Sequence, residues 1–234
     1  MSWHAKRTGG YTSDSQEFAD NVLQIYDFLS HDTYLIGDAW SYESIVGVLC
    51  NMAQESNMNP WIYNGSRYGL VQFTFNYYRQ QGSRYSAYAP STSPSATSDG
   101  AKPSDGQAQL QVIDAPSNTL YLANERRKQL ARDLNWAILE WTDLQSYKVC
   151  DDIDQAIQAW LLFYEYPEST VAGMQEEFAK RVAYKNRIIE ILGGTPPTPP
   201  DPPVPPTPPT PTSPEGMPLY FYITKKFKRK KGLI

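Results

Sequence analysis

Glu55 is the residue of this sequence whose position best suits acid catalysis. It closes an apolar run, from Ile45 to Ala53, that the sequence predicts as a buried helix, and it continues the face of Val48 and Met52. Burial and the negative end of a helix dipole both disfavour an ionised carboxylate, so we expect a raised pKa. A carboxylic acid that holds its proton near neutral pH is what glycosidic bond cleavage requires. The alternative is an ordinary solvated acid at a helix end.

Glu165 is the second carboxylate of interest. It stands between Tyr164 and Tyr166, directly after an apolar helical stripe that begins at Ile153. In that position it could activate water or stabilise positive charge at an anomeric carbon. The alternative is an ion pair with a nearby arginine. The distance between the two carboxylates, which the sequence does not give, would separate hydrolysis from an intramolecular transfer that needs one acid alone.

The cysteines and histidines suggest a rival, a cysteine peptidase with Cys50 or Cys150 as nucleophile and His31 as base. Cys50 lies within the apolar helix, where a thiol is normally inert, and Cys150 precedes two aspartates that oppose thiolate formation. A disulfide between the two cysteines is conceivable. With two Cys and two His in the whole chain, we expect neither a metal site nor a cofactor.

Five helices are expected to position these groups, which makes the predicted fold mainly α. Their apolar residues recur at helical spacing. The segments are Phe18–Leu29 with Ser15 as a cap, Ser41–Ser56, Leu130–Trp141, Ile153–Tyr164, and Met174–Leu192, which ends at Gly193 and Gly194. A Ser- and Pro-rich stretch, Gly82–Ser104, is predicted to be an exposed loop.

Several motifs follow one another in the order typical of lysozyme-like enzymes that cleave peptidoglycan. They are Trp3 with Gly10-Tyr11, Leu49-Cys50-Asn51, Glu55-Ser56, Asn59-Pro60-Trp61, Tyr68-Gly69-Leu70-Val71-Gln72, Asp105-Gly106-Gln107-Ala108-Gln109 and Tyr164-Glu165-Tyr166-Pro167. Together they resemble the phage tail lysozyme family over most of residues 3–192. Lytic transglycosylases and goose-type lysozymes share the plan. Two residues depart from the pattern, since Cys50 replaces a glycine and Phe73 a tryptophan.

The resemblance implies a lysozyme-like helical domain that cuts the glycan strand of the cell wall. Glu55 would protonate the oxygen between N-acetylmuramic acid and N-acetylglucosamine, and Glu165 would be the second catalytic group. Gln72 would hydrogen-bond a sugar, although bracing its own turn is an equal alternative. Aromatic faces for sugar rings would come from Tyr68, Trp61, Phe73 and Tyr164.

Composition divides the chain into three parts. Residues 1–194 form the predicted domain and hold 23 of the 25 acidic and 15 of the 21 basic residues, a net charge of −8 that disfavours nucleic-acid binding. Residues 195–218 contain 13 prolines and are predicted to be an extended linker of about 70 Å. Residues 219–234 are aromatic and then basic, with alternation that suits a strand added to a partner's sheet.

These parts predict an enzyme carried on a phage particle. The terminal peptide would anchor it to phage tail proteins at the tail tip or knob, and peptidoglycan would be its substrate. Neither a membrane span nor the apolar core of a signal peptide is found, which fits synthesis in the host cytoplasm. Two alternatives stay open, an inactive virion module that binds the wall and an endolysin released at lysis.

Overall fold

The computed structural model describes seven stretches of the chain: residues 3–6, 9–31, 39–64, 67–74, 105–114, 124–137 and 144–194. All of them fall in the first of the two units into which the chain divides, Met1–Pro197 and Thr198–Ile234. The predicted loop Gly82–Ser104, the linker and the terminal peptide lie outside the described residues, as do Ile138 and Trp141.

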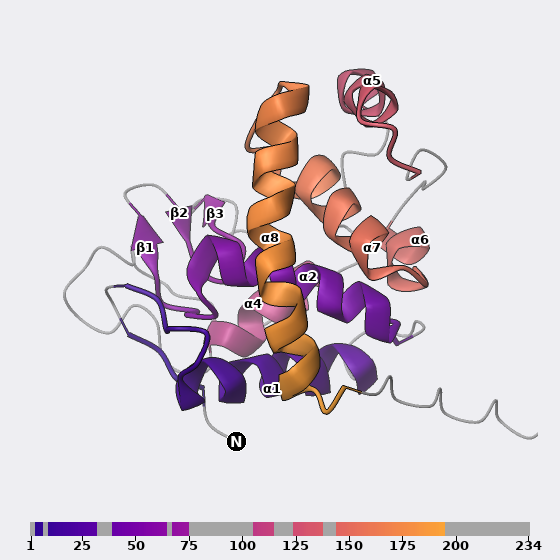
Figure 1. Cartoon of the computed structure of the whole chain (residues 1–234). Coiled ribbons are helices and arrows are strands. Elements are labelled where there is room, and N and C mark those ends of the chain that lie inside the picture. Colours follow the sequence, from indigo (N-terminus) through magenta and orange to yellow (C-terminus); the bar gives the residue numbers. More distant parts are fainter. Residues whose placement is uncertain are drawn as a thin grey trace, which may run out of the picture. The chain divides into compact units, whose positions relative to one another are not determined.

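The described part is mainly helical, as predicted (Figure 1). Its helices are α1 (Gln16–His31), α2 (Tyr42–Ser56), α4 (Asp105–Ile113), α5 (Glu125–Asp133), α6 (Leu144–Lys148), α7 (Ile153–Trp160), the π-helix η1 (Leu161–Glu165) and α8 (Val171–Ile191). Among the described residues, no helix is long and apolar enough to cross a membrane.

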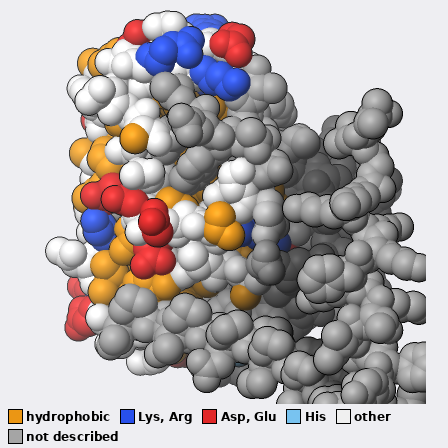
Figure 2. Space-filling view, turned by 90° about the vertical axis from the view of Figure 1, so that its right-hand side faces the viewer, with side chains coloured by type: hydrophobic (Ala, Val, Ile, Leu, Met, Phe, Trp, Pro, Cys, Tyr) orange, Lys and Arg blue, Asp and Glu red, His pale blue; other side chains and the backbone are white. Residues whose placement is uncertain are grey.

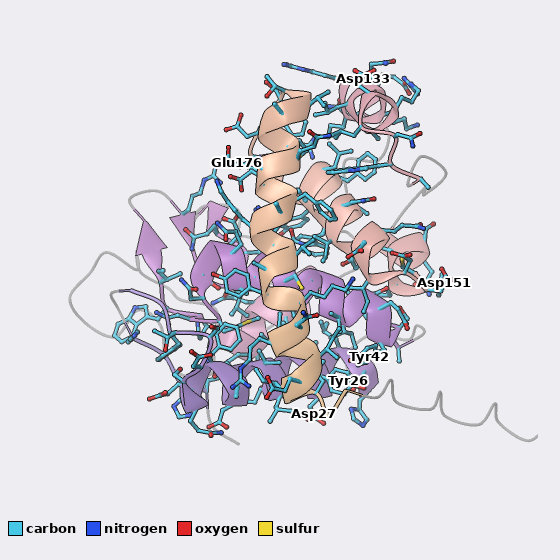
Figure 3. The ribbon with its side chains drawn as sticks, viewed as in Figure 1. Tyr26, Asp27, Tyr42, Asp133, Asp151 and Glu176 are labelled. Carbon is cyan, nitrogen blue, oxygen red and sulfur yellow. The ribbon has the colours of Figure 1, made fainter. Side chains whose placement is uncertain are left out.

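Helix α2 is the centre of the core. Ser41 caps its N-terminus by accepting a hydrogen bond from the Ser44 backbone N–H, at 3.1 Å. Twelve of its fifteen residues are buried, because α1, α7 and α8 all pack on it. Helix α8 crosses over α2 and α1 (Figure 1), and Tyr26 of α1 meets Tyr42 of α2 edge-on, with ring centroids 6.4 Å apart (Figure 3). The apolar stripes on three helices thus close around the helix that carries Glu55.

Gly47 lets α2 and α7 approach closely. A Cβ atom built at Gly47 would lie 2.4 Å from the Cβ of Ala156 and 2.9 Å from the Ala156 carbonyl carbon. Real Cβ atoms do not come that close, so a side chain there must push the helices apart. Glycine is therefore required by packing rather than by backbone conformation.

Gly47→Ala is expected to lower the free energy of unfolding by about 1–3 kcal/mol, because the overpacked helix contact outweighs the gain in helix propensity. Urea titration of the purified chain would measure the loss. The double variant Gly47→Ala with Ala156→Gly removes the facing Cβ and should recover part of it. A single variant as stable as the wild type would mean that the two helices separate without cost.

The predicted helix Ile153–Tyr164 is present and changes character halfway. After α7 it continues as the π-helix η1, in which the Tyr166 N–H donates to the Leu161 carbonyl at 2.7 Å with Tyr166 at φ 49°. Arg127 of α5 donates to the carbonyls of Leu162 and Phe163, at 3.0 and 2.8 Å, and its guanidinium lies 4.4 Å from the Tyr166 ring centroid. Single-turn π-helices are frequent at functional sites, and this one ends on Glu165.

Three features differ from the sequence-based expectations. The helix predicted over Leu130–Trp141 begins earlier and ends at Asp133, since Asn135 adopts φ 55°. Helices α4 and α6 were not expected. A small antiparallel sheet was not expected either; its strands β1 (Tyr63–Asn64), β2 (Arg67–Tyr68) and β3 (Phe73–Thr74) pair in chain order.

Charge is unevenly spread over the described surface. Lys and Arg side chains gather at the end of the domain where α5 lies, and acidic side chains form a separate group on the same face (Figure 2). Arg126 and Arg132 of α5 are exposed, as are Asp151 and Asp152 before α7. Glu55 and Glu165 instead pair within the fold, with an arginine of α8.

Candidate active site

Glu55 lies in the last turn of α2, where the chain leaves the core. Asn57 and Met58 both adopt left-handed backbone conformations, with φ of 47° and 58°, and the Asn57 N–H donates to the Ala53 carbonyl at 2.9 Å. Ser56 turns its hydroxyl back onto the Met52 carbonyl, at 2.8 Å. The helix therefore stops abruptly just past Glu55, whose side chain is 19% exposed although most of α2 is buried.

The guanidinium of Arg181 on α8 holds Glu55 and Glu165 together. One of its nitrogens, Nη2, donates to Glu55 Oε1 at 2.7 Å and to Glu165 Oε2 at 2.6 Å. The Arg181 side chain is 0% exposed and that of Glu165 is 6% exposed, so this pairing lies beneath the surface. Both predicted carboxylates are thus brought to one place, and the arginine that was considered as a structural partner of Glu165 is present.

The remaining donors of Arg181 are used as well. Its Nε donates to Asn51 Oδ1 at 2.8 Å, and its Nη1 donates to Glu177 Oε2 at 2.7 Å. Asn51 is itself oriented by donating to the Gly47 carbonyl at 2.8 Å. A buried guanidinium with every nitrogen paired is fixed in position, and it fixes the carboxylates that it binds.

The two catalytic candidates differ in how strongly burial affects them. Burial raises the pKa of Glu55, and the neighbouring Arg181 opposes this shift. Burial raises the pKa of Glu165 further, to about 8, again against the attraction of Arg181. The pKa of Glu55 is therefore raised, as the sequence predicts. The cause is mainly burial, as expected for a carboxyl group at the end of a core helix.

The two carboxylates are also close. Because Glu55 Oε1 and Glu165 Oε2 bind the same nitrogen through bonds of 2.7 and 2.6 Å, these oxygens lie at most about 5.3 Å apart. The carboxyl groups are near enough for a hydrogen bond between them, which lowers the pKa of Glu55 and raises that of Glu165. Two carboxylates make such a bond only when one of them carries a proton.

The small sheet lies close enough to Glu55 for the charge of Arg67 on β2 to lower the pKa of that carboxyl group. Tyr68 and Phe73, two of the predicted sugar-binding residues, are opposite one another in the pairing of β2 with β3. Gln72 precedes β3 in a left-handed conformation, with φ 51°, and its Nε2 donates to the Gly69 carbonyl at 3.0 Å. Bracing of this turn, the alternative considered for Gln72, is thus realised, and sugar binding by Gln72 stays a prediction.

The turn between β2 and β3 is held from α4 by Gln109. Its Oε1 accepts from the Leu70 N–H at 2.6 Å, and its Nε2 donates to the Pro60 carbonyl at 2.8 Å. Gly69, at φ 80°, leaves room for this amide, since a Cβ there would lie 2.2 Å from Gln109 Oε1. The Gly-Leu-Val-Gln and Asp-Gly-x-x-Gln motifs, more than thirty residues apart, are therefore two halves of one structure.

Gln109→Ala is expected to lower the free energy of unfolding by about 2–4 kcal/mol, because it leaves a buried N–H and a buried carbonyl without partners. Thermal and urea unfolding would measure the loss. Gln107→Ala, an exposed change on the same helix, is the matched control and should stay within about 0.5 kcal/mol of wild type. Equal stability of both variants would show that water replaces the Gln109 amide at no cost.

The other predicted residues have clear positions. Trp61 is half-buried against the core, and Tyr164 of η1 stacks on Trp160 with ring centroids 4.4 Å apart, so one face of the Tyr164 ring is covered.

Cys50 and Cys150 are both buried free thiols, and they form no disulfide. Burial raises the pKa of the Cys50 thiol and raises that of Cys150 to about 11. Neither cysteine is suited to be a nucleophile, which removes the support for a cysteine peptidase.

Arg181 was not singled out from the sequence, although a signal exists. It falls seven residues after Met174 and seven before Ile188, on the stripe of α8 that is buried. A charged residue on an apolar stripe indicates a buried ion pair or a site.

Among the described residues, no group of three or more His, Cys, Asp and Glu side chains could hold a metal ion. A pocket of about 450 Å³ is lined by Trp3 and by residues of α1 and α4, Phe28 among them, and contains neither Glu55 nor Glu165.

Comparison with known proteins identifies the family of this chain. The family model for phage tail lysozyme matches residues 20–192, a span that contains Glu55, Glu165 and Arg181. No individual curated protein matches the chain. The match covers about three quarters of the sequence and includes α2, η1, α8 and most of α1, which together build the site and its core. The chain therefore belongs to the phage tail lysozyme family.

Proposed function

We propose that this protein cleaves the bond between N-acetylmuramic acid and N-acetylglucosamine in the host cell wall during infection, with Glu55 as general acid. The observation that carries the proposal is the position of Glu55. It ends a buried helix, is still reachable from solvent, and lies on a guanidinium beside a second carboxylate. Burial raises its pKa, and a carboxyl group that keeps its proton can protonate a leaving glycosidic oxygen.

Family membership supports the coarser part of this function. Phage tail lysozymes are peptidoglycan glycosidases and virion-associated proteins, so the chain is a peptidoglycan glycosidase in general terms. The proposal adds the bond, the acid and the sugar contacts. For the contacts we propose Gln72, Tyr68, Trp61, Phe73 and Tyr164.

Glu165 is proposed as the second carboxylate of the reaction, and its spacing bears on the product. Inverting glycosidases hold their carboxyl groups about 6.5–9.5 Å apart so that a water molecule fits between them. The separation of at most about 5.3 Å between bound oxygens of Glu55 and Glu165 leaves less room than that. This disfavours an inverting hydrolysis. Of the other mechanisms, a transglycosylation, in which the muramyl 6-hydroxyl attacks its own anomeric carbon, needs no contact between Glu165 and the sugar.

The test is digestion of purified peptidoglycan by the full chain, with mass spectrometry of the fragments. Muramic acid at new reducing ends identifies hydrolysis at the proposed bond, and 1,6-anhydro ends identify transglycosylation. Release of stem peptides alone, or glucosamine at the new reducing ends, would contradict the proposal. Binding to peptidoglycan without any release would favour the inactive wall-binding module instead.

Delivery is proposed to depend on residues 195–234. A proline-rich spacer followed by an aromatic and basic peptide suits a tether to phage tail proteins at the tail tip or knob, after synthesis in the host cytoplasm. Deleting residues 195–234 should leave wall cleavage within about twofold of the full chain, since the site is built by residues 51–181. The same deletion should abolish incorporation into particles, as measured by immunoblot of purified virions. Normal incorporation of the shortened chain would instead favour a tether within the domain, and absence of the full chain from virions would favour a soluble endolysin.

A further inference from the structure

We propose that Glu165 is a positioning residue that acts through Glu55: the two carboxyl groups, both held on Nη2 of Arg181, share a single proton that Glu165 keeps within reach of Glu55. The inference rests on the proposed function of Glu55 as general acid. It assigns Glu165 a role in supplying the proton, rather than in contacting the sugar or the attacking water.

The geometry leaves Glu165 one partner besides the arginine. Its Oε2 accepts from Arg181 Nη2 at 2.6 Å and from Nε at 3.2 Å. Its Oε1 is buried and has no hydrogen-bond donor among the described side chains. The carboxyl group of Glu55 lies within hydrogen-bonding distance. A proton on one of the two carboxyl groups lets it donate to the other, and this reduces the cost of burying carboxyl oxygens that lack a donor.

The count of charges points the same way. Arg181 faces three carboxylates, those of Glu55, Glu165 and Glu177, and the third is also bound by Lys180 at 2.7 Å. Glu177 lies nearer the surface than Glu165, where Lys180 pairs with both Glu177 and Glu176, so the group held on Nη2 of Arg181 is one guanidinium and two carboxyl groups. One shared proton makes this group of three neutral. Two ionised carboxylates would instead leave a net negative charge in the interior, with two like charges close together.

Other charged groups around the pair do not remove the need for the proton. Arg67 on β2 lowers the pKa of Glu55, and Glu177 on α8 raises it. Both effects are smaller than those of burial and of Arg181. Burial dominates for Glu165, whose pKa rises to about 8. From α6, Tyr147 lies within reach of the charge of Glu165; burial first and this charge among others raise the pKa of Tyr147, so its hydroxyl is neutral in this range.

The shared proton has a defined path in the reaction. The bond between the two carboxyl groups lowers the pKa of Glu55 and raises that of Glu165, so Glu165 is its donor at rest and passes the proton to Glu55 in the reactive form, where Glu165 is the carboxylate paired with Arg181. As the bond between the anomeric carbon and the glycosidic oxygen breaks, that oxygen takes the proton from Glu55 and leaves as a hydroxyl. The attacking water, or the muramyl 6-hydroxyl, gives its own proton back to the pair through Glu55. Glu165 remains bound to the arginine throughout.

Glu165→Gln tests the inference, because glutamine keeps the size and the oxygen that binds Arg181 but cannot share an acidic proton. In this variant the alkaline limb of the pH profile of kcat/KM should move to lower pH by about one unit or more, with activity kept on the acidic side. Glu176→Gln is the matched control. Glu176 is labelled on α8 in Figure 3, its side chain is 70% exposed, and its replacement should leave the profile in place.

Unfolding as a function of pH gives a second measurement that needs no activity. The folded pKa of Glu165, about 8, lies above its usual value of 4.5, so the folded chain keeps a proton that the unfolded chain releases. This contribution to stability is full below about pH 4.5 and is lost as the pH rises through about 8. The difference in melting temperature between wild type and Glu165→Gln should therefore fall over that range.

The outcomes are separable from those of the proposed function. A uniform loss of activity with an unmoved alkaline limb, or a melting difference that does not change with pH, would overturn the shared proton and leave Glu165 a structural partner of Arg181. A wild-type chain that cuts no glycan at any pH would refute the proposed function. The melting comparison would still show whether Glu165 keeps a proton in the folded chain, which the shared proton requires.

Discussion

Glu55→Gln is expected to reduce glycan cleavage by about 10³-fold, because general acid catalysis contributes roughly 10²–10⁴-fold and glutamine has no proton to give. The fold should be retained. The introduced amide still offers an oxygen to Nη2 of Arg181, where Glu55 Oε1 binds at 2.7 Å, and the change removes a carboxyl group whose ionised form burial disfavours. We therefore expect the free energy of unfolding to change by less than about 1 kcal/mol.

The measurement is the initial rate of fragment release from purified peptidoglycan, with circular dichroism to verify folding. Glu190→Gln is a suitable control, since Glu190 is an exposed side chain of α8 that pairs with Arg187 at 2.9 Å and should leave the rate unchanged. Glu55→Asp should fall between the two, because it keeps the acid but withdraws it from the substrate by one methylene. If Glu55→Gln keeps more than a tenth of the wild-type rate, another group supplies the proton.

The helices that could be predicted from the sequence are those with long apolar stripes. The residues Phe18, Val22, Ile25 and Leu29 are all buried in α1, and the apolar run of α2 fills the core as expected. Ser15 accepts from the Phe18 N–H at 3.2 Å, and Gly193 and Gly194 adopt positive φ after α8, so these predicted ends are confirmed. Burial of one face decides the structure of such segments, and a periodic pattern of apolar residues indicates which face is buried.

The missed elements are short or end on local backbone geometry. Helix α6 has five residues and each strand of the sheet has two, which is too few for any periodicity to be counted. The helix predicted through Trp141 ends early because Asn135 takes a left-handed conformation, which asparagine tolerates. Neither effect leaves a pattern in the flanking apolar residues.

The candidate site was half predictable for a related reason. Glu55 and Glu165 could be found because each adjoins an apolar stripe in its own segment. Arg181 could not be joined to them, because it lies 126 residues after Glu55 and meets it only when α8 crosses α2. Asn51 gives the same lesson, since nothing in the Leu-Cys-Asn motif indicates the guanidinium that donates to it at 2.8 Å. Long-range polar contacts have no local signature.

The largest expected effect on stability lies away from the site, at a buried ion pair between α6 and the end of α4. Lys148 Nζ binds Asp114 Oδ1 at 2.7 Å, and the two side chains are only 6% and 3% exposed. Trp40, which precedes α2, donates from its indole nitrogen to the same oxygen at 2.8 Å. Three segments of the chain therefore meet at one carboxylate.

Lys148→Met should lower the free energy of unfolding by about 3–5 kcal/mol, because it leaves the Asp114 carboxylate buried without a cation. The double variant Lys148→Met with Asp114→Asn should recover most of that loss, since the neutral amide still accepts from Trp40 and no charge stays buried. Urea unfolding of the wild type and both variants measures the two differences. A single variant that loses less than about 1 kcal/mol would mean that water reaches Asp114. A double variant as unstable as the single one would mean that Lys148 stabilises the fold through the packing of its side chain. The ion pair itself would then contribute little to holding α4 and α6 against the N-terminus of α2.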